Sequence, residues 1–314
     1  MTYSRRERFM RVKVPATSAN LGAGFDVFGL ALKEPYDIVE ARRIPEKAVR
    51  IKLAEGYEVP LKPEENTGGY VALRMIEDLD LQGGVEFRIW KGIKPGSGLG
   101  SSAATAAAAA YAVNKLFDLG LSRERLVEYA ALGELISAGS PHPDNVASAI
   151  YGGFVMISSR NPLKIYAVDP PPDLGVVVAL PIVEKASTRR AREILPRMIE
   201  LERYAYNVGR AATLAAGMSL GDLEMIKEGM DDLIVEPLRA RAGIIPEYDG
   251  VKELGRRLNA GIAVSGAGPA IIGVIEKERR EILAKELEKF YASRGYGCEI
   301  YVTEPGPGVS EIDG

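Results

Sequence analysis

Residues 95–110 read PGSGLGSSAATAAAAA, a loop rich in glycine and serine that leads directly into a run of alanines. Glycine lets the backbone turn sharply and approach a ligand closely, because it has no Cβ. Alanine has the highest helix propensity, so a helix is expected at once. The first turn of a helix has unpaired N–H groups and the positive end of the helix dipole. The pattern therefore predicts a helix N-terminus that binds an anionic group such as phosphate.

This loop matches neither of the two common phosphate-binding motifs. A Walker loop needs lysine after its last glycine, but Ser101 follows Gly100. A Rossmann fingerprint needs a third glycine, and this chain has Ser101 there too. Loop amides and hydroxyls remain to wrap a phosphate, with Ser101 or Ser102 available to bind a metal ion. The alternative is an ordinary turn between a strand and a helix.

Glu134 lies in a predicted helix among small apolar residues. At 100° per residue it shares a face with Val127, Ala130 and Ala131. A buried carboxylate is costly unless a cation or hydrogen bonds compensate it, and a divalent metal that bridges to nucleotide phosphates would do so. The helix could equally pack loosely and leave Glu134 in solvent, so both interpretations stay open.

The segment SAGSPHPDNVASAIYGG, residues 137–153, contains the only histidine of the chain, His142, close to Asp144 and Asn145. Polar residues that gather on a loop often form a site. One histidine without cysteine or histidine partners argues against a transition-metal site. The competing interpretation is that Asp144 and Asn145 only cap the helix that follows.

Residues 187–192, STRRAR, break a local rule. A Ser or Thr that suits an N-cap is followed at once by three arginines, and cations in a first turn oppose the helix dipole. Residues that cost stability locally are candidates for function, and guanidinium groups bind carboxylate or phosphate. Arg192 is therefore a candidate anion ligand. Arg239, in VEPLRARAGIIP, is a second candidate of the same kind. For both, the alternative is an arginine side chain exposed to solvent.

Two further glycine-rich turns occur, NLGAGFDVFGLAL at 20–32 and VSGAGPAII at 264–272. Each alone could be a tight hairpin. Three such loops in one chain, with polar residues beside them, suggest one shared crevice for a small molecule.

The elements that must position these loops indicate two domains. Residues 85–90 alternate and predict a strand before the first loop, and Asn66 suits the cap of an earlier helix. Residues 169–173, DPPPD, mark a boundary, because three prolines continue neither a helix nor a central strand. Beyond it, the order is close to the β-α-β-β-α-β of a ferredoxin-like domain. The prediction is an α+β chain with domains at 1–170 and 171–314 and the active site in the cleft between them.

Composition limits the classes of partner. The 314 residues carry a net charge of −3 and are 46% hydrophobic, which gives no general attraction to nucleic acid or to an anionic membrane. A single cysteine excludes an internal disulfide framework. No apolar window approaches the ~20 residues that span a bilayer, so we expect a cytoplasmic protein that binds neither nucleic acid nor membrane. The sequence does not give the oligomeric state, and a homodimer stays open.

The three glycine loops resemble the three signature motifs of the GHMP kinases, the superfamily of galactokinase, homoserine kinase, mevalonate kinase and phosphomevalonate kinase. PGSGLGSSAA resembles their phosphate loop, and SGAGPA their C-terminal glycine motif. PATSANLGAGFD and HPDNVASAIYGG resemble most the homoserine kinases of that superfamily. The resemblance extends from about Val12 to Gly268.

This resemblance implies a ribosomal-protein-S5-like N-terminal domain and a ferredoxin-like C-terminal domain. It also implies transfer of the ATP γ-phosphoryl group to the side-chain hydroxyl of L-homoserine, a step of threonine biosynthesis. Two alternatives are kept: the same fold acting on another small alcohol such as mevalonate or shikimate, and a non-catalytic nucleotide-binding relative.

Carried over by position, the resemblance assigns roles to individual residues. Ser102 and Glu134 would hold Mg²⁺, and Asn66 would lie in the adenine pocket. The residues around the amino acid would be Asn20, Asp26, His142, Asp144 and Asn145, with Arg192 and Arg239 clamping its carboxylate. The triphosphate would be wrapped by Pro95, Gly96, Ser97, Gly98, Leu99, Gly100, Ser101, Ser102, Ala103 and Ala104.

The chemistry of the reaction adds two expectations. A zwitterionic substrate needs an anion for its ammonium group, and Asp26 is our candidate. Asp144 is the candidate base near the hydroxyl. Because an Asp of ordinary pKa is a weak base for an alcohol, positioning of the hydroxyl by Asn145 is the alternative.

Overall fold

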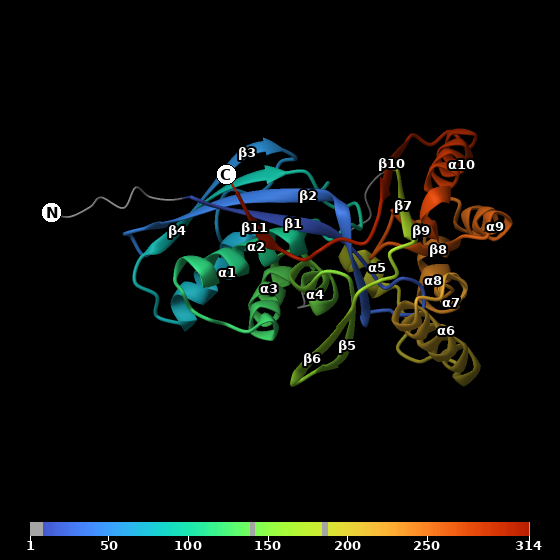
Figure 1. Cartoon of the computed structure of the whole chain (residues 1–314), viewed down its shortest axis with the longest axis horizontal. Helices are drawn as coiled ribbons and strands as arrows, with labels where there is room; N and C mark the ends of the chain where they lie inside the picture. The colour runs from blue at the N-terminus through green and yellow to red at the C-terminus, as the bar shows by residue number, and fades with distance from the viewer. Residues whose placement is uncertain (1–8, 139–141, 184–187, 314) are drawn as a thin grey trace.

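The structure is a computed structural model, and it describes residues 9–138, 142–183 and 188–313. Figure 1 shows the N-terminal half, blue to green, beside the C-terminal half, yellow to red. Each half is built on its own sheet. The glycine-rich loops therefore come from two different sheets, and the two halves must pack together to bring them into one site.

In the described residues the first sheet has seven strands, with β11, β1, β2, β4 and β3 side by side and the β5–β6 hairpin paired to β2. Only β3 and β4 are parallel neighbours. Its strands are β1 (Met10–Ala19), β2 (Phe28–Ile44), β3 (Val49–Gly56), β4 (Gly84–Lys91), β5 (Phe154–Arg160), β6 (Leu163–Val168) and β11 (Ser310–Ile312).

β2 begins inside the first glycine-rich segment, residues 20–32. Residues 28–32, which belong to the first glycine-rich segment, already pair with β1 and β5. Only residues 20–27 form the turn, because Leu30, Ala31 and Leu32 are fully buried in the sheet. The segment therefore does connect two antiparallel strands, as the hairpin interpretation has it, but the turn itself is confined to residues 20–27 and is not tight.

Four helices pack against the first sheet, below it in Figure 1. The alanine run forms α2, whose small side chains let α1, α3, α4 and β1 approach closely, and most of them are fully buried. Asn66 caps α1 as predicted, with its side chain accepting hydrogen bonds from the amides of Gly68 and Gly69. These helices are α1 (Thr67–Asp78), α2 (Ser101–Leu116), α3 (Arg123–Ala138) and α4 (Pro143–Tyr151).

The second sheet has four strands in the described chain, all antiparallel, in the order β10-β7-β9-β8. That order is the one expected of the split β-α-β-β-α-β arrangement. The strands are β7 (Leu174–Pro181), β8 (Gly261–Val264), β9 (Ile271–Glu276) and β10 (Cys298–Thr303). The helices are α5 (Thr188–Glu193), α6 (Leu201–Leu220), α7 (Leu223–Gly229), α8 (Val235–Arg241), α9 (Tyr248–Leu258) and α10 (Arg280–Ala292).

The chain passes between the two sheets more than once. Residues 169–173 lead from β6 to β7, and after β10 the chain returns so that β11 pairs with β1. The domain division at residue 170 stays a prediction. No helix among the described residues is long and apolar enough to cross a membrane.

Candidate active site

The phosphate loop lies where β4 passes into α2, and its glycines are required by geometry. Gly96, Gly98 and Gly100 have φ values of 74°, 88° and 65°, a region that favours glycine. A Cβ on Gly98 would lie 2.4 Å from the carbonyl oxygen of Ser265. Gly100 is itself the N-cap of α2, so the loop delivers the backbone directly into the helix.

A cavity of about 420 Å³ opens in front of this loop. It brings Asn66, Ser102 and Glu134 together with the third glycine loop, residues 266–268, from the second sheet. The predicted nucleotide residues divide into two groups here. Those that line the cavity are Asn66, Pro95, Gly96, Gly98, Gly100, Ser101 and Ser102, whereas Ser97, Leu99, Ala103 and Ala104 are buried behind it.

Ser102 and Glu134 meet across the cavity wall. The Ser102 hydroxyl donates to Glu134 Oε1 at 2.8 Å, and Glu134 is only 7% exposed. The interpretation of Glu134 as a solvent-exposed side chain is therefore wrong. One hydroxyl and one carboxylate are oxygen ligands of the kind that Mg²⁺ accepts, and this ion is usually completed by phosphates and water. The described residues include no group of three or more His, Cys, Asp or Glu that could hold a metal by themselves.

Lys91 and Asp37 form a buried ion pair behind the loop that the motifs do not reveal. Lys91 Nζ donates to Asp37 Oδ2, to the Ser101 carbonyl oxygen at 2.8 Å and to Thr105 Oγ1 at 3.1 Å. Both side chains are almost fully buried. Burial lowers the pKa of Lys91, and the Asp37 charge opposes that change. The Lys91–Asp37 pair carries no net charge, and its ammonium group is bonded to the first turn of α2.

A recess of about 50 Å³ adjoins the nucleotide cavity and shares Glu134 and Asn145 with it. Its wall collects residues from both halves of the chain. The predicted substrate residues that line it are Asn20, His142, Asp144, Asn145, Arg192 and Arg239.

Asp26, the remaining predicted substrate residue, does not line this recess but is bonded to Arg192, which does. Arg192 holds it through two hydrogen bonds, and Arg160 approaches Asp26 Oδ2 to 3.1 Å. Burial raises the pKa of Asp26, but the hydrogen bond and charge of Arg192 outweigh burial and keep it below its ordinary value. Asp26 is therefore an anion whose partners in this structure are guanidinium groups.

Arg239 and Asn20 converge on the third glycine loop. Asn20 Nδ2 and Arg239 Nη1 both donate to the Gly266 carbonyl oxygen at 2.7 Å. On the same short helix as Arg239, the fully buried Glu236 accepts from the Val264 amide at 2.7 Å. Ser265 in turn donates to the Gly98 carbonyl oxygen at 2.8 Å. The three glycine loops are thus joined by hydrogen bonds into one unit.

The environment of α4 changes the chemistry of its first residues. Helix α4 begins at Pro143 with His142 as N-cap, so Asp144 lies inside the first turn and the capping interpretation was wrong. Burial, reinforced by the Asp26 charge, raises the pKa of Asp144 to about 6. Burial and the Arg192 charge lower the pKa of His142 to about 4. Thr17 Oγ1 donates to Asn145 Oδ1 at 2.8 Å and fixes that amide.

The dipole argument for residues 187–192 was wrong for Arg192, because the helix is short. Helix α5 has only six residues, Thr188–Glu193, so its first and last turns overlap and Arg192 lies in the last turn, where a cation is favourable. The proposed Ser187 cap lies outside the described residues, as do 139–141 of the histidine loop. Arg192 nevertheless lines the recess, together with the other predicted substrate residues named above.

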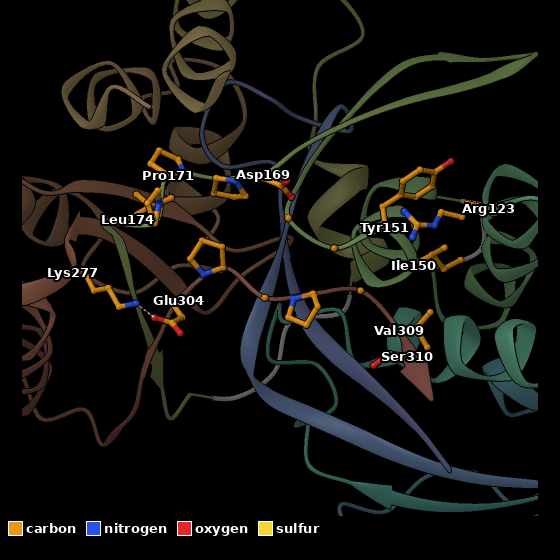
Figure 2. Close-up of a pocket in the computed structure, with 18 residues that line it drawn as sticks. Arg123, Ile150, Tyr151, Asp169, Pro171, Leu174, Lys277, Glu304, Val309 and Ser310 are labelled. Atoms are coloured by element: carbon orange, nitrogen blue, oxygen red, sulfur yellow. Dashed lines mark ion pairs between the residues drawn. The ribbon is translucent and has the colours of Figure 1, made fainter. Parts of the chain in front are cut away.

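A larger cavity, of about 740 Å³, lies elsewhere, between the proline-rich connection at 170–172 and the returning segment at 304–310. Figure 2 shows Lys277 and Glu304, an ion pair at 2.5 Å, on one side of it and Arg123 with Tyr151 on the other. It takes in the last residues of the 137–153 segment, 150–153, but none of the predicted catalytic, nucleotide or substrate residues. Size alone therefore does not identify the site.

Comparison with protein families matches two parts of the chain. Residues 67–153 match the model for the GHMP kinases N terminal domain, and residues 213–293 match the model for GHMP kinases C terminal. The first match contains the phosphate loop, Glu134 and the α4 residues. The second contains Arg239 and the third glycine loop.

Individual relatives are similar over nearly their whole length. A homoserine kinase of Methanococcus maripaludis is 46% identical over 310 residues, covering 96% of this chain and 99% of the relative. One of Haloarcula marismortui is 40% identical, with 96% and 99% covered. The crystal structure of homoserine kinase from Cytophaga hutchinsonii has a TM-score of 0.90 and 35% identity, covering 99% of this chain and all of that one.

Proposed function

The chain belongs to the GHMP kinase family, and on that premise we propose that it transfers the γ-phosphoryl group of ATP to the side-chain hydroxyl of L-homoserine, giving O-phospho-L-homoserine and ADP. One observation carries the proposal. The cavity at the phosphate loop shares a wall with a recess lined by the guanidinium groups of Arg192 and Arg239, and the carboxylate of Asp26 is paired with Arg192 behind it. An amino acid with a side-chain hydroxyl presents the complementary charges. The reaction would belong to threonine biosynthesis.

In the nucleotide cavity, the proposed phosphate ligands are backbone amides and the positive end of the α2 dipole. The amides of the loop and the first turn of α2 would hold the phosphates, while Asn66 and the residues before it would face the base. The Ala104 amide already donates to the Gly100 carbonyl oxygen, so phosphate contacts fall to the residues before it. Lys91, paired with Asp37, holds the Ser101 carbonyl oxygen and so fixes the start of the helix beneath the phosphates.

Ser102 and Glu134 are the residues that would hold Mg²⁺. When bound, the ion would neutralise phosphate charge and help to align the phosphates. Hydroxyl and carboxylate already lie in contact, so little rearrangement would be needed to present both oxygens to one cation.

In the recess, charged side chains that now pair with one another would bind the charged groups of the substrate instead. The homoserine carboxylate would bind Arg192 and Arg239, and its ammonium group would bind Asp26. Arg192 and Asp26 neutralise one another in this structure, so each would give up part of that contact to the substrate. Fixing both charged ends leaves the hydroxyl as the free end, which points it toward the transferring phosphate.

The proton of the hydroxyl has two possible routes. Asp144, with its pKa raised to about 6, is a better base than an ordinary Asp and is still ionised at neutral pH. Asn145, held by Thr17, would orient the hydroxyl. As the new oxygen–phosphorus bond forms and the bond to the ADP oxygen breaks, the proton passes to Asp144 or to a phosphate oxygen.

ADP release tests the proposal. The protein is assayed with ATP and Mg²⁺ and, separately, with L-homoserine, mevalonate and shikimate, with Ser102→Ala as the matched inactive control. We expect ADP and a phosphorylated amino acid in equal amounts with homoserine only. ADP formed only with mevalonate or shikimate would overturn the substrate, and tight ATP binding without turnover on any alcohol would overturn the enzyme.

A further inference from the structure

Arg160 contacts Asp26, although it lies outside every motif that the sequence singles out. It is the last residue of β5. Its Nη2 atom donates to the Asp26 carbonyl oxygen at 3.2 Å and lies 3.1 Å from Asp26 Oδ2. One nitrogen thus bridges the main chain and the carboxylate of the same residue.

The main chain of Asp26 needs this support. Its φ is 60°, in the left-handed region that is unfavourable for most residues with a Cβ. Its amide donates to Asn20 Oδ1 at 3.1 Å, and its carbonyl oxygen accepts from Arg160. The carbonyl oxygen of the next residue, Val27, accepts from the Ile157 amide of β5 at 2.9 Å. Strand β5 therefore holds the turn that carries Asp26.

The two arginines that bind Asp26 come from different halves of the chain. Arg192 is on α5 in the C-terminal half, whereas Arg160 and Asp26 both belong to the first sheet and its turns. The Arg160 contact therefore does not depend on how the two halves pack together. In the proposed function, Arg192 gives up part of its contact with Asp26 to the substrate carboxylate. Arg160 is then the side chain that keeps Asp26 in place.

Charge gives Arg160 a second effect. The Asp26 side chain is 17% exposed, and a largely buried carboxylate stays ionised only beside cations or hydrogen-bond donors. Burial raises its pKa, whereas Arg192, and then His142 and Arg160, lower it. His142 is neutral at neutral pH, because burial and Arg192 lower its pKa to about 4. Arg239 faces Asp26 too. Since both other arginines would bind the substrate carboxylate, Arg160 is the cation that stays with Asp26.

We propose that Arg160 is a positioning residue for substrate binding, which holds the main chain and carboxylate of Asp26 for the ammonium group while Arg192 turns to the carboxylate of the amino acid. The inference rests on the proposed function, because it takes Asp26 as the ligand of the ammonium group. Arg160 is 48% exposed, so its ion pair contributes little to folding stability. Its removal is therefore expected to change substrate binding and not the fold.

Three variants separate this role from a general effect of charge. Arg160→Met removes both contacts to Asp26 and keeps an unbranched side chain. Arg160→Lys keeps a cation with donors for the same two oxygens. Lys164→Met, the matched control, removes an exposed charge from β6, the other strand of the same hairpin. Each is assayed for ADP release with homoserine and ATP varied in turn from about pH 5 to 9, and for unfolding by urea.

Arg160→Met should raise KM for homoserine about tenfold, at the low end for hydrogen bonds to a charged group because the pair is partly exposed. KM for ATP and the urea midpoint should stay unchanged. Arg160→Lys should recover most of the loss, and Lys164→Met should behave as the unaltered protein. Burial raises the pKa of Asp144, and the charge of Arg160 partly offsets that change. The rise of kcat/KM with pH should therefore move to higher pH in Arg160→Met and in neither of the other two variants.

A double variant decides whether Arg160 acts through Asp26. In the Asp26→Asn background, adding Arg160→Met should raise KM for homoserine by less than about twofold. The full rise in that background would make Arg160 a direct ligand of the substrate and overturn the proposal, as would an unchanged KM in Arg160→Met by itself. If the unaltered protein releases no ADP with homoserine, the proposed function is overturned and this inference with it. The other contrary outcomes overturn this inference alone and leave the function intact.

Discussion

Arg192 holds Asp26 with both arms of its guanidinium, at 2.6 and 3.2 Å, across the cleft between the two sheets. Asp26 comes from the turn after β1, and Arg192 from α5 in the other half of the chain. In our proposal the two side chains receive opposite ends of one zwitterionic substrate. The contact between them neutralises both charges and keeps both groups in place before the substrate binds. On binding, each side chain would exchange part of that contact for a contact with the substrate.

Asp26→Asn should weaken homoserine binding selectively. Removing the carboxylate leaves the substrate ammonium without its anion, a loss of about 2–3 kcal/mol, so KM for homoserine should rise about 30- to 150-fold while KM for ATP changes little. Steady-state ADP release with each substrate varied in turn measures this. Asp169→Asn in the remote cavity is the matched control. An unchanged homoserine KM would remove Asp26 from the substrate site.

Ser102→Ala and Glu134→Gln should lower kcat by about 100-fold or more without unfolding the protein. Both residues are predicted to hold one ion, so the double variant should be little worse than either single one. The readout is kcat against Mg²⁺ concentration. Additive losses, or variants that show an unchanged requirement for Mg²⁺, would contradict a shared site.

Asp144 should give both activity and stability a pH dependence. The unfolded chain loses this proton near pH 3.8, whereas the folded chain holds it to about pH 6. Ionisation therefore costs the native state about 3 kcal/mol as pH rises from about 4 to 6, and the cost persists above that range. The rate constant kcat/KM should rise through pH 6 as the base forms. Asp144→Asn should lose that rise and, at pH 8, unfold at higher urea than the parent protein.

Gly98→Ala should abolish nucleotide binding. The residue has φ 88°, and a Cβ would lie 2.4 Å from the Ser265 carbonyl oxygen, so the phosphate loop and the third glycine loop would have to separate. Gly120→Ala is the control, since Gly120 also has positive φ, 63°, but open space around it. Calorimetric titration with ADP distinguishes them. Normal binding by Gly98→Ala would mean that the loop is not closed by this contact.

Lys91→Met should destabilise the fold and the phosphate loop together. It leaves Asp37 as an unpaired buried charge, which typically costs about 3–5 kcal/mol, and frees the Ser101 carbonyl at the start of α2. Lys47→Met breaks the exposed pair with Asp80 and should cost less than about 1 kcal/mol. Urea unfolding compares the two, and KM for ATP should rise only for Lys91→Met. Equal stabilities would contradict a structural ion pair.

Local patterns in the sequence determined the elements and the loops between them. The Asn66 cap, the strand before the glycine loop, the alanine helix and the order of elements beyond residue 174 depend on propensities and spacings within a few residues, and the structure has them. Ser102 and Glu134 were singled out in the same way, and their roles stay predictions. Each is chemically unusual for its own surroundings.

Tertiary structure alone decided which distant side chains meet. No spacing rule links Asp37 to Lys91, Thr17 to Asn145, or Asp26 to Arg192, which are 54, 128 and 166 residues apart. The pKa of Asp144 depends on its burial and on the Asp26 charge, both of which arise only when segments far apart in the sequence pack together. Hydrogen bonds and charges act over a few ångströms of space, whereas the sequence specifies only neighbours along the chain.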